Sequence, residues 1–295
     1  MGTHMAKAND FIDPRIRVQR DGLYDPFFEH SSCGVGFVVN VDGRKTHQIV
    51  INGITILKNL VHRGAVGGDS RTGDGAGMLV QVPHRFFERE ADRLGFGLPA
   101  EGLYGVAMLF LPLDQEKRSR ARELVEDAVT AGEGTLLGWR EVPANPELLG
   151  ELALASMPHI SQAFASFGTN ATEDPNATEY RGPRGRELSG EALERKLYVT
   201  RKVIESMAAA EGFSMEELYV NSFSCRTIVY KGMFVAPQFE SFYPDLRDPD
   251  FESALAVIHQ RYSTNTFPSW PLHPHARRSD EHHQRPAEER GRRPD

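Results

Sequence analysis

The chain has 295 residues, 40% of them hydrophobic, and a formal net charge of −7, as expected for a globular protein with a substantial core. The acidic balance excludes the basic surface that attracts nucleic acid, so nucleic acid is not an expected partner. No apolar stretch approaches the ~18 residues that cross a membrane, and the first residues lack the apolar segment of a signal peptide. We therefore expect a cytoplasmic protein with no membrane partner, whose two cysteines, Cys33 and Cys225, are free thiols.

The start of the chain differs in character from the residues after it. Residues 1–32 are polar, show no sustained period and are interrupted by two Asp-Pro pairs, at 13–14 and 25–26. A segment of this kind has little apolar area to bury. We predict an extended leader over 1–32 that ends just before Cys33.

The first dense block predicts a strand, a helix and a second strand. The strands are expected at 34–41 and 76–82, where β-branched and aromatic residues gather. Between them an apolar stripe recurs at helical spacing, and its members are Val50, Ile54, Leu57 and Val61. The triplet at 62–64, His-Arg-Gly, is interpreted as a cationic last turn followed by a glycine stop.

The rest of the ordered chain alternates further strands and helices. Five strands are expected, at 103–111, 135–143, 160–167, 224–232 and 255–263, with helices at 114–131 and 191–210 and a long polar loop at 168–190. The run at 103–111 is apolar almost throughout, which indicates a strand covered on both faces. Because the alternation is not strict, the pattern supports a mixed α and β fold and no more.

Two further segments yield weaker hypotheses. TGDGAG at 72–77 lacks the ending of a phosphate-binding loop and is interpreted as a tight turn, with Asp74 as a residue that could shape a site. Residues 273–295 hold nothing that can bury apolar area and are predicted to be disordered. This stretch is either a solvated tail or, as we favour, the product of a frame change or truncation. Its histidine pairs, at 273–275 and 282–283, are not expected to form a metal site.

Cys33 lies in HSSCGVGF at 30–37, where two interpretations are open. It could be a small apolar residue of the core. It could also be a nucleophile, because cleavage before Cys33 would free an α-amine with a pKa of about 8 on the same residue, able to act as the base of the thiol.

The block from Cys33 to Phe87, together with HQRYSTNTFPSW at 259–270, resembles the glutaminase domain at the front of glutamate synthase large subunits. That domain is a class II glutamine amidotransferase and an N-terminal-nucleophile hydrolase. The resemblance runs to about residue 272. It implies an α+β fold, the four-layer αββα sandwich of these hydrolases, present as a partial domain over 33–272 and incomplete at the C-terminus. Residues 1–32 would be the removable leader, and 273–295 a tail outside the family.

The resemblance also implies the site. Cys33 would be the nucleophile and Arg63 an active-site arginine near it, although a cation at a helix C-terminus would account for Arg63 equally well. Arg261 would hold the α-carboxylate of glutamine, a task suited to a bidentate guanidinium. The residues expected to line the same pocket are Tyr262, Ser263 and Thr264. On its own, the stretch around Arg261 could be a strand end with an exposed arginine.

The implied reaction is hydrolysis of L-glutamine to glutamate and ammonia. In the parent enzyme, an oxidoreductase, the ammonia would serve the reductive amination of 2-oxoglutarate. FMN and an iron–sulfur cluster would belong to the remainder of that enzyme, with no cofactor or metal in this segment. The expected partners are L-glutamine, the rest of the large subunit and the small subunit. In relatives, the chain continues into an Asn-Gly pair that stabilises the oxyanion and then an aspartate that binds the amino group of the substrate. Here residues 273–295 take the place of both, so whether this chain catalyses the reaction stays open.

Two other classes of function remain open at this stage. One is an inactive fragment or a module that binds glutamine or a partner. The other is an N-terminal-nucleophile hydrolase of a different amide, such as an acylase. An incomplete sandwich also predicts an exposed apolar edge and poor solubility.

Overall fold

The computed structural model describes residues 34–64, 66, 69–168, 181–182, 185–186, 188–260 and 269–271, with the main chain alone at 63, 181–182 and 185–186. The chain divides into two units, 1–33 and 34–295, and all described residues belong to the second. Cys33 and residues 261–264 therefore lie outside the described residues.

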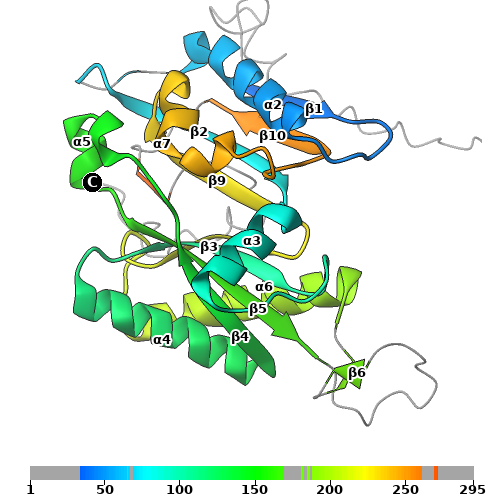
Figure 1. Cartoon of the computed structure of the whole chain (residues 1–295). Helices are drawn as coiled ribbons and strands as arrows, with labels where there is room; N and C mark the ends of the chain where they lie inside the picture. Colours follow the sequence, from blue (N-terminus) through cyan, green and yellow to red (C-terminus); the bar gives the residue numbers. More distant parts are fainter. Residues whose placement is uncertain are drawn as a thin grey trace, which may run out of the picture. The chain divides into compact units, whose positions relative to one another are not determined.

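Two antiparallel sheets form the centre of the described unit (Figure 1). The first sheet has the order β1 (Val35–Val39), β10 (Leu255–His259), β2 (Thr72–Gln81) and β9 (Thr227–Phe234). The second has the order β4 (Gly134–Glu141), β5 (His159–Phe167), β3 (Gly105–Leu111) and β8 (Tyr219–Ser224).

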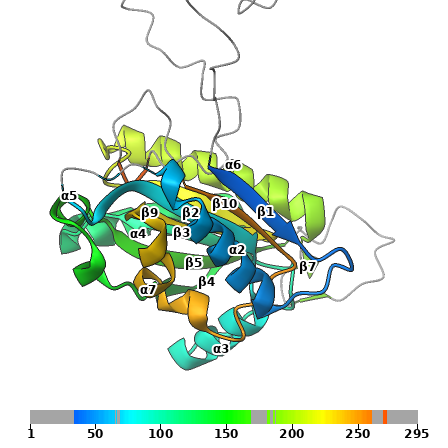
Figure 2. The ribbon, with the colours of Figure 1, turned by 90° about the horizontal axis from the view of Figure 1, so that it is seen from above.

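Helices cover the outer faces of these sheets, as the two views in Figures 1 and 2 show. On the side of the first sheet are α2 (His47–Asn59) and α7 (Phe239–Phe242), and on the side of the second are α4 (Gln115–Ala131) and α6 (Gly190–Ala210). The remaining helices are α3 (His84–Leu94), α5 (Glu151–Ala155) and the short turns η2 (Val61–Arg63), η3 (Pro146–Leu148), η4 (Ala236–Gln238) and η5 (Pro244–Arg247). The layers run α, β, β, α, which confirms the predicted α+β sandwich.

The central strand of the second sheet behaves as its sequence predicts. Every residue of β3 is buried. Val106, Met108 and Phe110 join the larger core, whereas Ala107, Leu109 and Leu111 join a second core beneath α4 and α6. The apolar run therefore reflects burial on both faces of one strand.

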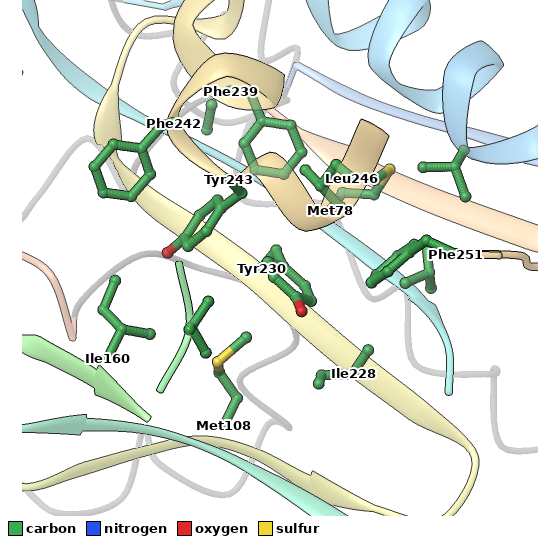
Figure 3. Packing of buried hydrophobic residues seen from close by; sticks show 14 of the residues in the cluster. Met78, Met108, Ile160, Ile228, Tyr230, Phe239, Phe242, Tyr243, Leu246 and Phe251 are labelled. Atoms are coloured by element: carbon green, nitrogen blue, oxygen red, sulfur yellow. The ribbon is translucent and has the colours of Figure 1, made fainter. Parts of the chain in front are cut away.

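The larger core is rich in aromatic side chains around β9. Tyr230 packs edge-on against Tyr243, with ring centroids 5.0 Å apart, and against Phe251 at 5.5 Å. Figure 3 shows Met108 of the second sheet below the rings of Tyr230 and Tyr243. Aromatic rings of this size bury large areas and prefer such edge-on packing. This cluster holds the two sheets and η5 together.

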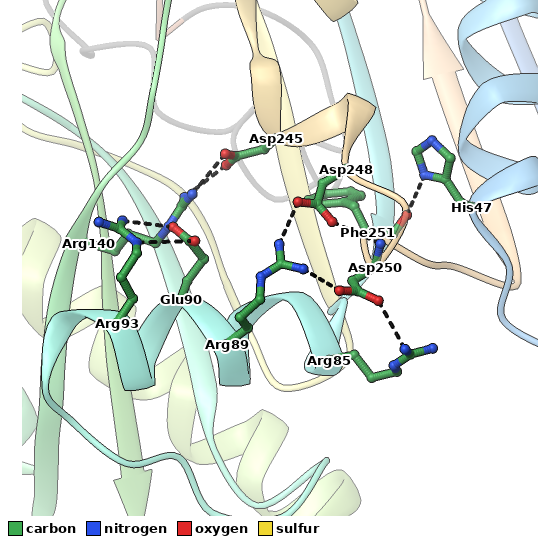
Figure 4. A network of polar contacts seen from close by, with 10 residues as sticks. All are labelled: His47, Arg85, Arg89, Glu90, Arg93, Arg140, Asp245, Asp248, Asp250 and Phe251. Carbon is green, nitrogen blue, oxygen red and sulfur yellow. Dashed lines mark hydrogen bonds and ion pairs between the residues drawn. The ribbon is translucent and has the colours of Figure 1, made fainter.

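A buried ion pair also joins the layers. Arg140 of β4 donates to both carboxylate oxygens of Asp245 in η5, each at 2.8 Å, and both side chains are almost fully enclosed. Arg140 also donates to Glu90 of α3 at 3.0 Å (Figure 4). Burial by itself would lower the pKa of Arg140, but the hydrogen bonds and charge of Asp245 outweigh it, so that this pKa lies above its usual value.

The edge strand β1 leaves apolar side chains uncovered. Val35, Phe37 and Val39 are 53%, 72% and 51% exposed, whereas Gly36 and Val38 on the other face of the strand lie toward α2 and the core. The expected exposed apolar edge is confirmed. The same strand pairs with β10 alone among the described strands.

Three sequence-based expectations need correction. The strand predicted at 224–232 begins later, as β9 at Thr227, because a turn at Ser224–Arg226, held by hydrogen bonds to Glu194 of α6, separates it from β8 of the other sheet. Helix α3 was not predicted, although it is strongly amphipathic, with Phe86 and Phe87 buried. Two short paired strands, β6 (Arg181–Gly182) and β7 (Gly185–Arg186), lie in the expected polar loop.

Among the described residues, no helix combines the length and the apolarity that crossing a membrane requires.

Candidate functional site

The main chain pairs the residue that follows Cys33 with the residue that precedes Arg261. Strands β1 and β10 are antiparallel, with Val35 opposite His259, and the pairing continues one residue further because the Gln260 N–H donates to the Gly34 carbonyl at 2.8 Å. Gly34 and Gln260 are both buried. Each is covalently joined to a predicted site residue, Cys33 or Arg261, whose Cα lies about 3.8 Å from that of its neighbour. The candidate nucleophile and the candidate carboxylate-binding arginine thus flank one hydrogen-bonded pair.

The segment carrying Arg63 passes close to the same pair. Arg63 is the last residue of η2, and Gly64 follows it. A Cβ atom placed on Gly64 would lie 2.4 Å from Nε2 of Gln260 and 3.4 Å from Oδ1 of Asp74. Three stretches far apart in the sequence therefore converge here, at residues 34, 64 and 260. The Arg63 side chain lies outside the described part of the structure.

This contact corrects the interpretation of the triplet at 62–64. Helix α2 ends at Asn59, and Val61 is 45% exposed, so it does not extend the buried stripe of Val50, Ile54 and Leu57. Gly64 has φ −87°, outside the left-handed region of a glycine stop. A glycine suits this position because of its close approach to Gln260.

Gln260 is a residue that sequence reasoning missed. Its side chain is 1% exposed, and no described residue bonds to its Oε1. A buried amide oxygen without a partner is costly, so such groups often indicate a missing ligand or water. The signal that could have revealed Gln260 is the alternation of buried residues along β10. Ala256 and Ile258 face α2, and Gln260 continues that series and directs its amide beneath Gly64.

The segment TGDGAG is part of a strand and not a tight turn. It opens β2, where the pairing with β9 shifts between Thr72 and Ala76, and Gly75 has φ 125°. Such an irregularity bends a strand and redirects its side chains. Asp74 lies within this bend, beside Gly64 and Gln260. Its neighbourhood agrees with the hypothesis that Asp74 shapes the site.

Replacing Gly73 by alanine is expected to destabilise this bend. The added Cβ would lie 2.5 Å from the carbonyl carbon and oxygen of Phe234 and 2.7 Å from the nitrogen of Val235, so the main chain of β9 has to move. We expect a loss of about 1–3 kcal/mol in the free energy of unfolding, measured with urea. Gly97→Ala is the matched control, since no described atom lies within 4 Å of its added Cβ. Equal losses for both variants would contradict the steric explanation.

Cys225 is unsuited to nucleophilic chemistry. It is buried in the core beneath α6, and its N–H donates to Glu194 at 2.8 Å. Burial raises the pKa of the Cys225 thiol to about 12, and the Glu194 carboxylate adds to the rise. Because the thiolate is the reactive form, Cys225 is inert near neutral pH.

Comparison with known proteins agrees with this geometry. Residues 33–282 match the glutamine amidotransferases class-II. The chain belongs to this family. The family match begins at Cys33, the residue before Gly34. It also covers the other candidate site residues, which are Arg63 and residues 261–264.

Several relatives of this amidotransferase are glutamate synthases. It is 42% identical over 264 residues to the glutamate synthase [NADPH] large chain of Azospirillum brasilense, covering 89% of this chain and 16% of that protein. It is 39% identical over 249 residues to the corresponding large chain of Bacillus subtilis, covering 84% of this chain and 15% of that protein. It is 37% identical over 271 residues to ferredoxin-dependent glutamate synthase 1 of Arabidopsis thaliana, covering 91% of this chain and 16% of that protein. The amidotransferase thus spans about a sixth of the length of these relatives.

Proposed function

We propose that this chain is the glutaminase part of a glutamate synthase and hydrolyses L-glutamine to glutamate and ammonia. The observation that carries the proposal is the hydrogen-bonded pair of Gly34, which follows Cys33 at the start of the family match, and Gln260, which precedes Arg261.

In the proposed mechanism, Cys33 is the nucleophile after cleavage of the Ser32–Cys33 bond. The freed α-amine takes the thiol proton, and the thiolate attacks the side-chain carbonyl carbon of glutamine. The carbon–nitrogen bond then breaks, the leaving nitrogen takes up a proton and ammonia departs. Water attacks the γ-glutamyl thioester, which releases glutamate and returns the proton to the thiol. The oxyanion of each tetrahedral intermediate requires donors, and removal of one typically costs ~10²-fold or more in rate.

The binding roles proposed for the other residues follow from charge. Arg261 would bind the α-carboxylate of glutamine through a bidentate contact. Arg63 would supply a second positive charge to the active site. Tyr262, Ser263 and Thr264 would line the pocket. Because an inactive binding module and an acylase are not favoured by the family match, glutamine hydrolysis is the function proposed.

The remaining steps of a glutamate synthase would belong to other parts of such an enzyme. An iron–sulfur cluster is usually held by four cysteine thiolates. This chain has two cysteines in total, of which Cys225 is buried and inert, so its residues do not fit a cluster. The cluster, and FMN with it, would belong to the remainder of the large subunit, which, with the small subunit, would be the partner of this domain in the cytoplasm.

The test of this function is the intact mass of the chain before and after exposure to an electrophilic glutamine analogue. A mass that begins at Cys33 and gains one adduct would support processing, glutamine recognition and thiol attack together. A full-length mass without an adduct would contradict the proposal and favour an inactive fragment. Peptide mapping should locate the adduct at Cys33, because Cys225 is buried.

Replacing Arg261 by alanine is expected to raise the KM for glutamine by about 10- to 100-fold, the range expected for a lost charge-assisted contact. Glutamate release at varied glutamine concentration measures it. Hydrolysis of a simple acyl amide without an α-carboxylate is the control and should change little. Equal loss on both substrates would contradict an α-carboxylate role for Arg261.

A further inference from the structure

Strand β1 lies at one end of the first sheet, and among the described strands its outer side is open (Figures 1 and 2). In an antiparallel pair, residues whose main-chain groups bond to the partner alternate with residues whose groups point away from it. The Asn40 N–H donates to the Ala254 carbonyl at 2.7 Å, so the even-numbered residues along this strand direct these groups toward β10. The N–H and C=O groups of Val35, Phe37 and Val39 therefore point to the open side, where no described residue bonds to them.

The same three residues expose apolar side chains. Val35, Phe37 and Val39 are each more than half exposed, on the face of the sheet opposite α2. Leu255 and Val257 of β10 lie opposite Val39 and Phe37 in the register and are half-buried. Because side chains of directly opposed residues share one face, the five form a contiguous apolar patch. A patch of this kind indicates an interaction surface.

Strand β1 also lacks the features by which proteins protect an open strand. Edge strands usually carry a charged side chain, a proline or a bulge, which prevents pairing with another chain. Residues 34–41 have the sequence GVGFVVNV, without a charge or a proline, and β1 pairs with β10 in a regular register over all its residues. The open side of β1 is therefore able to accept a further strand.

The sequence of β1 is complementary to itself. An antiparallel copy centred on Phe37 would place Phe37 opposite Phe37 of the copy, and Val35 opposite Val39 of the copy. Two aromatic rings directly opposite each other, with β-branched neighbours on the diagonals, are favourable cross-strand contacts. Since the odd-numbered residues direct their main-chain groups outward, each of these pairs would exchange two N–H···O bonds, about six in all.

We propose that β1 is the interface through which two copies of this chain associate, with their first sheets joined across a two-fold axis at Phe37. The pairing does not depend on the proposed function. Its five residues from each copy are far fewer than the roughly 20–30 residues a side of a standard stable interface. The dimer is therefore expected to be weak, with a Kd of about 10–100 μM.

The test is sedimentation velocity of the chain at concentrations from about tenfold below to about tenfold above that range. We expect a monomer at the lowest concentrations and a dimer at the highest. Phe37→Lys would set two like charges opposite each other at the axis and is expected to weaken association by about tenfold or more. Its melting temperature should stay unchanged, because Phe37 is 72% exposed.

A charge exchange tests the position of the axis. Phe37→Lys and Phe37→Asp should each associate poorly alone, whereas their equimolar mixture should associate more strongly than either, because only the mixed pair sets opposite charges across the axis. Val199→Lys is the matched control, since Val199 is a 56% exposed valine on α6, in the other outer layer. It is expected to leave association unchanged.

Three results would overturn the proposal. A monomer at every concentration would leave the open side of β1 to a strand from another part of a longer chain. Equal weakening by Phe37→Lys and Val199→Lys would place the contact elsewhere, and a mixture of the two charged variants that associates no better than either alone would exclude the axis at Phe37. Growth beyond the dimer would likewise exclude a closed two-fold pair, because each copy has one β1.

Discussion

Replacing Cys33 by alanine is expected to abolish adduct formation with the glutamine analogue and to lower glutamine hydrolysis by about 10⁴-fold or more, since loss of a catalytic nucleophile removes the covalent route. Cys33 is one of only two thiols in the chain, and the other is buried with a pKa raised to about 12. The measurements are intact mass after labelling and the rate of glutamate release.

Cys225→Ala is the matched control for this prediction. It removes the other thiol and is expected to keep both the adduct and the hydrolysis, with a modest loss of stability from the small cavity left in the core. Retained labelling in Cys33→Ala, or its loss in Cys225→Ala, would contradict the assignment of Cys33 as the nucleophile. The N-terminal mass of each variant must be compared as well, because a change in leader removal would alter activity by a separate route.

Replacing Arg140 by alanine is expected to lower the free energy of unfolding by about 3–5 kcal/mol, the usual effect of removing one member of a buried ion pair. Asp245 would keep a carboxylate that is 3% exposed and has lost its two hydrogen bonds from the guanidinium. Urea unfolding followed by tryptophan fluorescence measures the change. A loss this large exceeds that expected for any surface substitution in the chain.

Arg93→Ala is the control, because Arg93 pairs with the same Glu90 but is 63% exposed. We expect a change within about 1 kcal/mol for it. In the Arg140→Ala background, Asp245→Asn should recover part of the loss, since it removes the unpaired charge and keeps an acceptor for the hydroxyl of Tyr230. Equal effects of Arg140→Ala and Arg93→Ala would show that the buried pair carries no special stability.

Periodicity in the sequence determined most elements of this fold. Continuous burial along β3, the buried stripe of α2 through Val50, Ile54 and Leu57, and the core position of Cys225 all follow from local patterns of apolar residues. Such patterns report which faces of an element avoid water, and burial is the dominant favourable term in folding. The resemblance of the block at Cys33 to a family of amidotransferases likewise required no coordinates.

Tertiary structure decided how the site is assembled. The need for glycine at Gly64 and the burial of the Gln260 amide both depend on which distant segments meet. Helix α3 is different, because its amphipathic pattern was present in the sequence and was overlooked, and the structure adds only the rings that cover Phe86 and Phe87. Local sequence determines the period of an element and its apolar face. Contacts between residues some 200 positions apart are set instead by the pairing of strands. For this reason only the folded chain brings Gly34, Gly64 and Gln260 together.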